Sequence, residues 1–339
     1  MEKPFLTIGI ASYNYAKRLA FAFEAIKRQT FKDFEILYCD DGSTDNSVEE
    51  IQKIIADNPD MNIRLVQGKN SGVMGNKNRI LDHACGKYVM LCDADDWMQD
   101  NCLELLCGTA KKTNADQVAA AFQNVDNDGR VLQVQEIPDN QTKWTWGIHH
   151  ATIYKMEIIE KYHLRMDTNC YPDDVYFNLI FHAHSGETVF LKDVVYNWCT
   201  HDDSTSSSQV KKSNWTGYPM LKSILPIIHD LFEVHQSDTE REKIEYMACK
   251  VYALAILYRY TGGGFQEFYR EYKECATFMK QLFSGYLKNK ALKTPDGKGY
   301  VRKRSALIIW GIGCLERLHC ICPALWGYWI LTHFVKLGI

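Results

Sequence analysis

Short apolar runs alternate with segments of helical periodicity over the first hundred residues. The apolar runs are rich in β-branched and aromatic residues, and they predict strands at 5–11, 34–39, 62–66 and 87–92. Between the first two runs, apolar residues recur at helical spacing from Leu19 to Ile26. Ser47 and Glu50 form a candidate capping box for a second helix. This β-α-β-α order predicts an α/β fold with a mainly parallel sheet covered by helices on both faces.

The pattern changes in the rest of the chain. Short strands, loops and aromatic clusters are expected from about 117 to 210, and a helical, polar region from about 215 to 285. A basic stretch follows at 288–304, and residues 305–339 are strongly apolar. Charged residues divide this apolar end into two runs, each too short to cross a bilayer.

Composition and charge exclude several classes of protein. The 339 residues are 46% hydrophobic and 24% charged, unlike a disordered or fibrous protein. A formal net charge of −3 argues against bulk binding of nucleic acid. The 12 cysteines form no CxxC pair, so we expect them to be small buried side chains in a reducing cytoplasm. The start of the chain lacks a basic segment before a long apolar core, so we expect no secretory signal peptide.

Carboxylates follow two of the predicted strands. Asp40 and Asp41 come directly after the second strand, and Asp93, Asp95 and Asp96 come after the fourth. Because ligands bind beyond the carboxyl ends of the strands in an open parallel sheet, we expect both clusters at one rim. A strand-end carboxylate such as Asp41 can accept a hydrogen bond from a nucleobase imide. The alternative for this motif is a turn followed by a helix cap.

The second acidic cluster suits a hard divalent cation. Asp93 and Asp95 lie on the same side of an extended segment, so both carboxylates can converge on Mg²⁺ or Mn²⁺ that also binds phosphate oxygens. Three neighbouring carboxylates after a buried strand would repel one another without a counter-ion. A solvated acidic turn is the alternative.

Two later segments contain further candidate groups. Asp173 and Asp174 open an expected helix, where they either cap the helix or provide a general base whose proton affinity is raised by its neighbour. His201 follows a strand-like segment, and it is either a metal or diphosphate contact or a structural histidine.

In combination, these motifs resemble the family 2 glycosyltransferases, inverting enzymes with the GT-A fold that build bacterial surface polysaccharides. The segments TIGIASYN, QTFKDFEILYCDDGSTDNS, Asn70-Ser71-Gly72, NKNR and CDADDW come in the family's order and spacing. PDDVYFN is similar to the family's acidic base motif, and YNWCTHDDSTS to its late segment near the donor diphosphate. The resemblance covers about residues 4–210.

The resemblance implies a nucleotide site in which Asp41 contacts the base, which looks like uracil, and Asp93 lies near the ribose. The full set of residues that it places at the nucleotide and donor is Ala11, Tyr13, Asp41, Asn70, Lys77, Asp93 and Asp96. Trp146, with the HHATIYK segment after it, and Asp173 would approach the donor sugar and the acceptor.

The resemblance also implies the chemistry. Asp95 and His201 would hold Mn²⁺ or Mg²⁺, and Asp174 would take a proton from the acceptor hydroxyl in a single displacement with inversion. The chain departs from the family at Cys199, where an arginine is common, and at Asp173, where a glutamate is common. The first departure concerns neutralisation of the diphosphate, whereas the second leaves the base in place.

The expected enzyme moves a sugar from a nucleotide-diphosphate donor, such as a UDP-sugar, to a hydroxyl of a glycan or lipid-linked acceptor. The alternatives are a non-catalytic sugar-nucleotide-binding protein, which predicts lost carboxylates, and a sugar nucleotidyltransferase. The latter usually has a Gly-rich, basic loop after the first strand, where this chain has Ser12–Tyr15.

We expect a GT-A catalytic domain over 1–212, with a nucleotide-binding half at about 1–100 and an acceptor half at about 101–212. A helical region would follow at 213–300, and an apolar tail at 301–339. Aromatic residues in the tail and the basic stretch before it suit an interface with anionic lipid, so we expect a cytoplasmic protein peripheral on the inner face of the membrane. A buried helix pair packed on the catalytic domain or on a second subunit, as in a homodimer, is the alternative.

Overall fold

The computed structural model describes residues 3–168, 173–200, 217–257 and 264–334. The chain forms two compact units, which are described separately. The α/β unit comprises Met1–Ile137 and Gly147–Asp202, and the helical unit comprises Pro138–Trp146 and Asp203–Ile339. The sequence predicts domain boundaries at 212 and 300, and these boundaries stay predictions.

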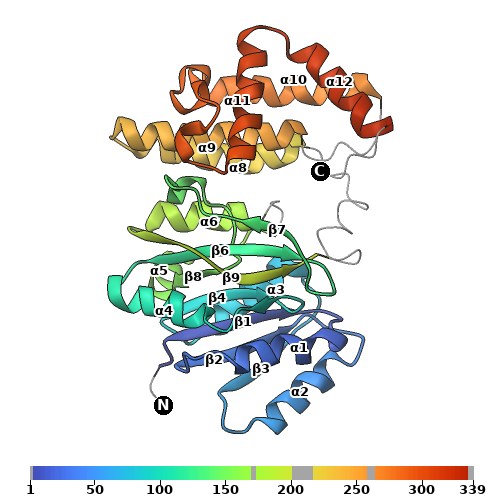
Figure 1. The fold of residues 1–339 in the computed structure, drawn as a ribbon, viewed down its shortest axis with the longest axis vertical. Helices are drawn as coiled ribbons and strands as arrows, with labels where there is room; N and C mark the ends of the chain where they lie inside the picture. Colours follow the sequence, from blue (N-terminus) through green and yellow to red (C-terminus); the bar gives the residue numbers. More distant parts are fainter. Residues whose placement is uncertain (1–2, 169–172, 201–216, 258–263, 335–339) are drawn as a thin grey trace. The chain divides into compact units, whose positions relative to one another are not determined.

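Four parallel strands form the first half of the sheet (Figure 1). They are β1 (Leu6–Ser12), β2 (Phe34–Asp40), β3 (Ile63–Gln67) and β4 (Tyr88–Asp93), in the order β3-β2-β1-β4. The helices between them are α1 (Ala16–Lys27), α2 (Ser47–Asp57) and α3 (Gly72–His83). In the register, Ala11 of β1 lies between Cys39 of β2 and Asp93 of β4. Both acidic clusters therefore begin at the same rim, as the sequence predicts.

The second half of the sheet is mixed. Its strands are β8 (Thr152–Lys155), β6 (Gln117–Val125), β9 (Thr188–Cys199), β5 (Trp97–Met98) and β7 (Val131–Gln135). β8 pairs antiparallel with both β4 and β6, while β9 runs parallel to β6 and antiparallel to β5. The predicted α/β class is confirmed, with parallel pairing across the first four strands. Beyond β4 the mixed directions arise because antiparallel neighbours need no crossover helix.

Three helices bury one face of this sheet. α3, α5 (Met156–Lys161) and α6 (Asp173–His184) contribute apolar side chains to a core shared with β2, β4 and β8. α3 lies directly against β1, because a Cβ added to Gly9 would be 2.1 Å from Cγ2 of Ile80. Close packing of α3 fixes the position of the polar residues on its first two turns, next to the rim. α4 (Cys102–Thr113) completes the helices of this unit in the described residues.

The helical unit packs its helices around a buried carboxylate. Its long helices are α8 (Gly217–Val234), α9 (Asp238–Leu257), α10 (Phe265–Leu282), α11 (Lys303–Arg317) and α12 (Ile321–Phe334). Glu316 of α11 is 7% exposed and accepts hydrogen bonds from the hydroxyls of Tyr252, Tyr272 and Tyr286. A buried carboxylate is tolerated only when such donors surround it, so α11 belongs to the core of this unit.

The apolar end of the chain forms α11 and α12, separated at Leu318–Cys320. Within the described ranges, no helix combines the length and the apolar character needed to cross a membrane.

A short segment of the first half of the chain belongs to the helical unit. This strap, Pro138–Trp146, includes the 3-10 helix η1 (Lys143–Thr145). Trp144 is 2% exposed and donates from Nε1 to Glu240 of α9 at 2.5 Å. The Thr145 hydroxyl donates to the Tyr300 carbonyl at 2.6 Å, and Lys250 donates to the Thr145 carbonyl at 2.9 Å.

Candidate active site

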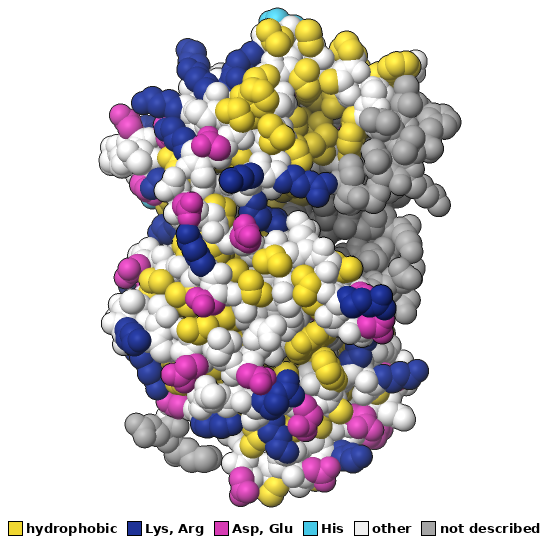
Figure 2. Space-filling view, viewed as in Figure 1, with side chains coloured by type: hydrophobic (Ala, Val, Ile, Leu, Met, Phe, Trp, Pro, Cys, Tyr) yellow, Lys and Arg dark blue, Asp and Glu magenta, His cyan; other side chains and the backbone are white. Residues whose placement is uncertain are grey.

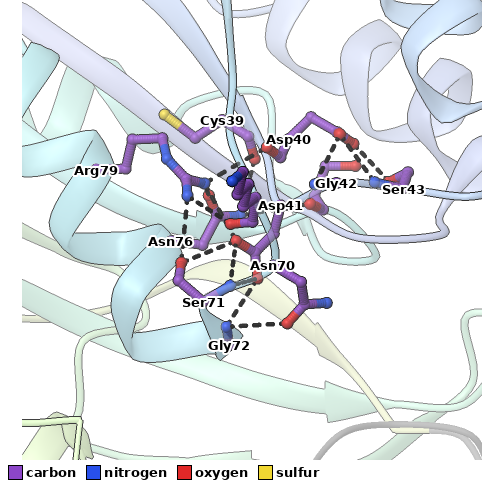
Figure 3. A network of polar contacts seen from close by, with 12 residues as sticks. Cys39, Asp40, Asp41, Gly42, Ser43, Asn70, Ser71, Gly72, Asn76 and Arg79 are labelled. Atoms are coloured by element: carbon purple, nitrogen blue, oxygen red, sulfur yellow. Dashed lines mark hydrogen bonds and ion pairs between the residues drawn. The ribbon is translucent and has the colours of Figure 1, made fainter.

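Asp41 joins the end of β2 to the start of α3 (Figure 3). Its carboxylate accepts from the Ser71 amide and hydroxyl, at 2.9 Å each, and from the Gly72 amide at 2.9 Å. Nη1 of Arg79 approaches the same carboxylate at 3.2 Å, and the Asp41 side chain is only 3% exposed. Both carboxylate oxygens are thus engaged by the chain itself, which fixes the loop before α3. Its predicted contact with a nucleobase stays a prediction.

Asp40 shapes the turn that follows β2. Its carboxylate accepts from the amides of Gly42 and Ser43, at 3.1 and 3.0 Å, and from the Ser43 hydroxyl. Gly42 has φ +74°, a conformation that favours glycine. The turn alternative weighed for the DDGS motif therefore describes Asp40 well. Asn14 bonds to the same loop by accepting from the Thr44 amide at 2.8 Å.

The rim around this loop carries the other predicted nucleotide contacts. Ala11 lies at the end of β1, and the Tyr13 side chain just beyond it is 43% exposed. Asn70 precedes α3 and accepts from the Gly72 amide at 3.3 Å. Their surroundings are compatible with a nucleoside lying across the ends of β1 and β2.

A buried cation lies at the end of β4. Lys77 of α3 is 2% exposed, and its ammonium is 3.3 Å from Asp93 and 2.8 Å from Nε2 of His149. Burial opposes ionisation of Asp93, but Lys77 and the two neighbouring histidines outweigh it and hold the pKa of that carboxyl well below its ordinary value. Burial and Lys77 lower the pKa of His149 to about 4. His149 is therefore neutral at pH 7 and accepts from the lysine.

His150 extends this cluster toward β9. Its Nε2 lies 3.7 Å from Asp93 and 3.6 Å from Asp96, and its ring stacks on Trp198 and on His149. Neither ring nitrogen of His150 has a hydrogen-bond partner among the described residues. The sequence placed the HHATIYK segment near the donor but gave neither histidine a role. Two adjacent histidines before a strand were the available signal.

Asp96 is buried beside two other carboxylates, Asp95 and Asp93. Its side chain accepts from the Tyr196 hydroxyl at 2.9 Å and from the Cys199 amide at 2.8 Å. Burial, together with the charges of Asp95 and Asp93, nevertheless raises the pKa of Asp96 well above its ordinary value. The neighbouring carboxylates therefore disfavour ionisation of Asp96, and a divalent cation would offset their repulsion.

Asp95 faces this acidic end. It is 8% exposed, and the Tyr15 hydroxyl donates to its Oδ2 at 3.4 Å. Burial, followed by the charges of Asp95 and Asp93, raises the pKa of Tyr15. Carboxylate oxygens are the hard ligands that Mg²⁺ and Mn²⁺ prefer, so the chemistry of Asp95 suits such an ion.

A second group of potential metal ligands consists of Asp93, His149 and His150. The Lys77 ammonium already contacts two of these three residues, at 2.8 and 3.3 Å. A metal ion bound there would have to displace or closely approach that positive charge. The predicted metal position at Asp95 stays a prediction.

The remaining predicted residues lie elsewhere or outside the described ranges. Asp174, in the first turn of α6, accepts from the Val175 amide at 3.0 Å, and Val175 packs against Gly147, two residues before His149. Trp146 is 5% exposed and belongs to the helical unit. The side chain of Asp173 and all of His201 lie outside the described residues.

The fold is that of the GT-A glycosyltransferases, and solved structures share the architecture. TarS of S. aureus, residues 1–349, in complex with UDP-GlcNAc aligns with a TM-score of 0.67 and 15% identity, covering 93% of this chain and 92% of that one. The mannosyltransferase PcManGT of Pyrobaculum calidifontis, solved with GDP-Man and Mn²⁺, gives 0.57 and 15%, covering 99% and 88%.

Residues 7–185 match glycosyl transferase family 2, and the chain belongs to this family. The hyaluronan synthase of Pasteurella multocida is 27% identical over 223 residues, which are 62% of this chain and 22% of that protein. The chondroitin synthase of Escherichia coli is 25% identical over 229 residues, 62% of this chain and 31% of that protein. The chain thus spans less than a third of the length of these relatives.

Proposed function

We propose that the chain transfers a sugar from a UDP-sugar, with inversion, to a hydroxyl of a glycan or lipid-linked acceptor. The observation that carries this proposal is the acidic cluster after β4, where Lys77 pairs with Asp93 while burial and the charges of Asp95 and Asp93 raise the pKa of Asp96. A divalent cation would offset the repulsion between these carboxylates, and a nucleotide diphosphate supplies the phosphate oxygens that such a cation prefers.

In this proposal each rim element holds one part of the donor. The loop that Asp41 fixes before α3 would lie against the base, and the Lys77–Asp93 pair would lie near the ribose. Asp95, with His201, would bind Mn²⁺ or Mg²⁺, which offsets charge that develops on the departing diphosphate. Rigid anchoring of these groups favours one donor orientation.

A UDP-release assay tests the function. We expect Mn²⁺-dependent release of UDP from at least one member of a panel of UDP-sugars, and no release by Asp95→Asn. Asp82→Asn is the matched control, because Asp82 forms an exposed ion pair with Arg165 away from the cluster. If the wild-type protein bound UDP-sugars but released no UDP even with acceptors supplied, the non-catalytic alternative would be supported.

Asp174 is proposed as the base that removes the proton from the acceptor hydroxyl. It opens α6, and Asn178 one turn later ties that turn to the sheet by accepting from Gln117 at 3.0 Å and Tyr154 at 3.1 Å. We expect Asp174→Asn to reduce transfer by at least about a thousandfold, in line with loss of general-base catalysis, while UDP affinity stays unchanged. Normal turnover by this variant would refute the assignment.

We also propose that the helical unit contacts a membrane peripherally, on the inner face. α11, α12 and the turn between them expose Leu307 (54%), Ile308 (39%), Leu318 (70%) and Trp326 (54%). Lys303 and Arg304 are exposed at the start of α11. Figure 2 shows apolar side chains gathered over the helical unit, with Lys and Arg beside them. An apolar surface with a basic margin suits anionic lipid headgroups.

Vesicle co-sedimentation tests the membrane contact. We expect binding to vesicles that contain phosphatidylglycerol, and loss of binding in the double variant Leu307→Asp, Ile308→Asp. Val234→Asp serves as the control, because Val234 is 68% exposed on α8. Equal sedimentation of both variants would contradict the contact. A change in oligomeric state caused by the double variant alone would favour a dimer interface instead.

A further inference from the structure

Arg18 lies in the first turn of α1 and reaches over to β9 and the loop after β6. Its Nη1 donates to Sγ of Cys199 at 3.4 Å, and its Nη2 donates to Oδ1 of Asn127 at 2.8 Å. Both partners are uncharged. Within the described part of the chain, no carboxylate forms an ion pair with this guanidinium, and several of its five N–H donors have no contact.

Cys199 connects this guanidinium to the acidic cluster. Its backbone amide donates to Oδ1 of Asp96 at 2.8 Å. Cys199 thus contacts the guanidinium through its side chain and Asp96 through its backbone amide. Arg18 lies at the edge of the proposed metal and diphosphate position.

Two other cations near the rim already have carboxylate partners. Lys77 pairs with Asp93, and Arg79 with Asp41. A nucleoside diphosphate bound with one divalent cation keeps net negative charge, and its phosphate oxygens match the planar donors of a guanidinium. Building on the proposed function, we propose that Arg18 contacts the donor diphosphate and neutralises its remaining charge.

This assignment accounts for the departure at Cys199. A cation is expected at that position from the family resemblance, and this chain has a small thiol there, 1% exposed. Arg18 donates to that thiol, so its guanidinium lies next to the position where the family commonly has an arginine. The positive charge thus comes from α1 rather than from the end of β9.

Binding of UDP, UMP and uridine in the presence of Mn²⁺ tests the proposal. We expect Arg18→Gln to weaken UDP binding by about tenfold or more, as for loss of a charge-assisted contact, with uridine binding changed less than twofold. Arg18→Lys keeps the positive charge but loses the planar donors of the guanidinium, so the UDP affinity of this variant should be intermediate. Arg28→Gln is the matched control, because Arg28 pairs with exposed Asp100 at the other end of α1.

Moving the charge gives a second test. We expect the double variant Arg18→Gln, Cys199→Arg to recover most of the lost UDP affinity, because the new guanidinium occupies the vacated space. Cys199→Arg alone places two cations together and should not improve on the wild type.

Some results would overturn the assignment. Equal loss of UDP and uridine binding in Arg18→Gln would mean a structural role for Arg18, and unchanged UDP binding would mean no contact. Both results presuppose wild-type protein that binds UDP. A wild type that binds no nucleotide would refute the proposed function itself, whichever variant is measured.

Discussion

At the scale of single residues, the site depends on how each charge is compensated. Lys77 is almost fully buried, and its partner Asp93 has a 30% exposed side chain. Breaking a buried pair by removing one partner is more costly than removing both, since one charge then lacks compensation. Lys77 therefore stabilises the fold as well as the charge state of the donor site.

We expect Lys77→Met to lower the free energy of unfolding by about 2–3 kcal/mol at pH 7, and Asp93→Asn in the same chain to restore part of it. Because the pKa of Asp93 is lowered in the folded protein, its stabilisation exists above the ordinary value of about 3.9 and is lost as pH falls through the folded pKa. The difference in free energy of unfolding between wild type and Lys77→Met should thus become smaller in acid.

Urea denaturation at several pH values measures this. Lys111→Met is the control, because Lys111 and Asp33 form an exposed pair and should contribute less than about 1 kcal/mol. If the difference in free energy of unfolding between wild type and Lys77→Met became larger in acid, the Lys77–Asp93 pair could not be its source.

At the scale of elements, the loop between β3 and α3 is ordered by a residue thirty positions earlier in the chain. Ser71 has no side-chain cap bond to its own helix; instead, Asp41 accepts from the first amides of α3. A carboxylate at a helix N-terminus satisfies amides that have no partner within the helix and interacts favourably with the helix dipole.

We expect Asp41→Asn to weaken this tie by about 1–3 kcal/mol, because a neutral amide replaces a charged acceptor that also pairs with Arg79. Hydrogen exchange of the peptide containing Ser71 and Gly72 should become faster, while β1 stays protected. Asp82→Asn, on the exposed side of α3, should leave that exchange unchanged. Unchanged exchange in Asp41→Asn would show that the loop is ordered by other contacts.

At the scale of the whole molecule, the strap connects the helical unit through the backbone to the histidine pair of the α/β unit. The strap ends at Trp146, and the chain re-enters the α/β unit at Gly147, directly before His149 and His150. Trp144 anchors the strap through Glu240 and through edge-on contact with His235, at 5.0 Å between ring centroids. The helices should therefore influence the histidine pair through the backbone between them.

We expect Trp144→Ala to destabilise the helical unit by about 3–5 kcal/mol, as for loss of a buried aromatic side chain, and to weaken UDP binding as well. Thermal unfolding and UDP titration measure the two effects. Trp326→Ala removes a 54% exposed tryptophan from the same unit and should change neither. Undiminished UDP affinity in a destabilised Trp144→Ala protein would rule out coupling through the strap.

The sequence alone determined the strands of the first half and the common rim of the acidic clusters, because buried parallel strands are continuous apolar runs and their ends must meet. It also determined the family, through motifs whose residues are close together in the chain. The antiparallel pairs beyond β4 were not predictable, since strand direction depends on partners far away in the sequence.

Only the tertiary structure decided which charges neutralise each other. Lys77 meets Asp93 and His149 because α3, β4 and the segment before β8 converge, although 72 residues separate Lys77 from His149. The contact of Arg18 with Cys199 spans 181 positions. Local pattern identifies which groups can ionise, whereas their pKa values and partners depend on burial and distance, which exist only once the chain has folded.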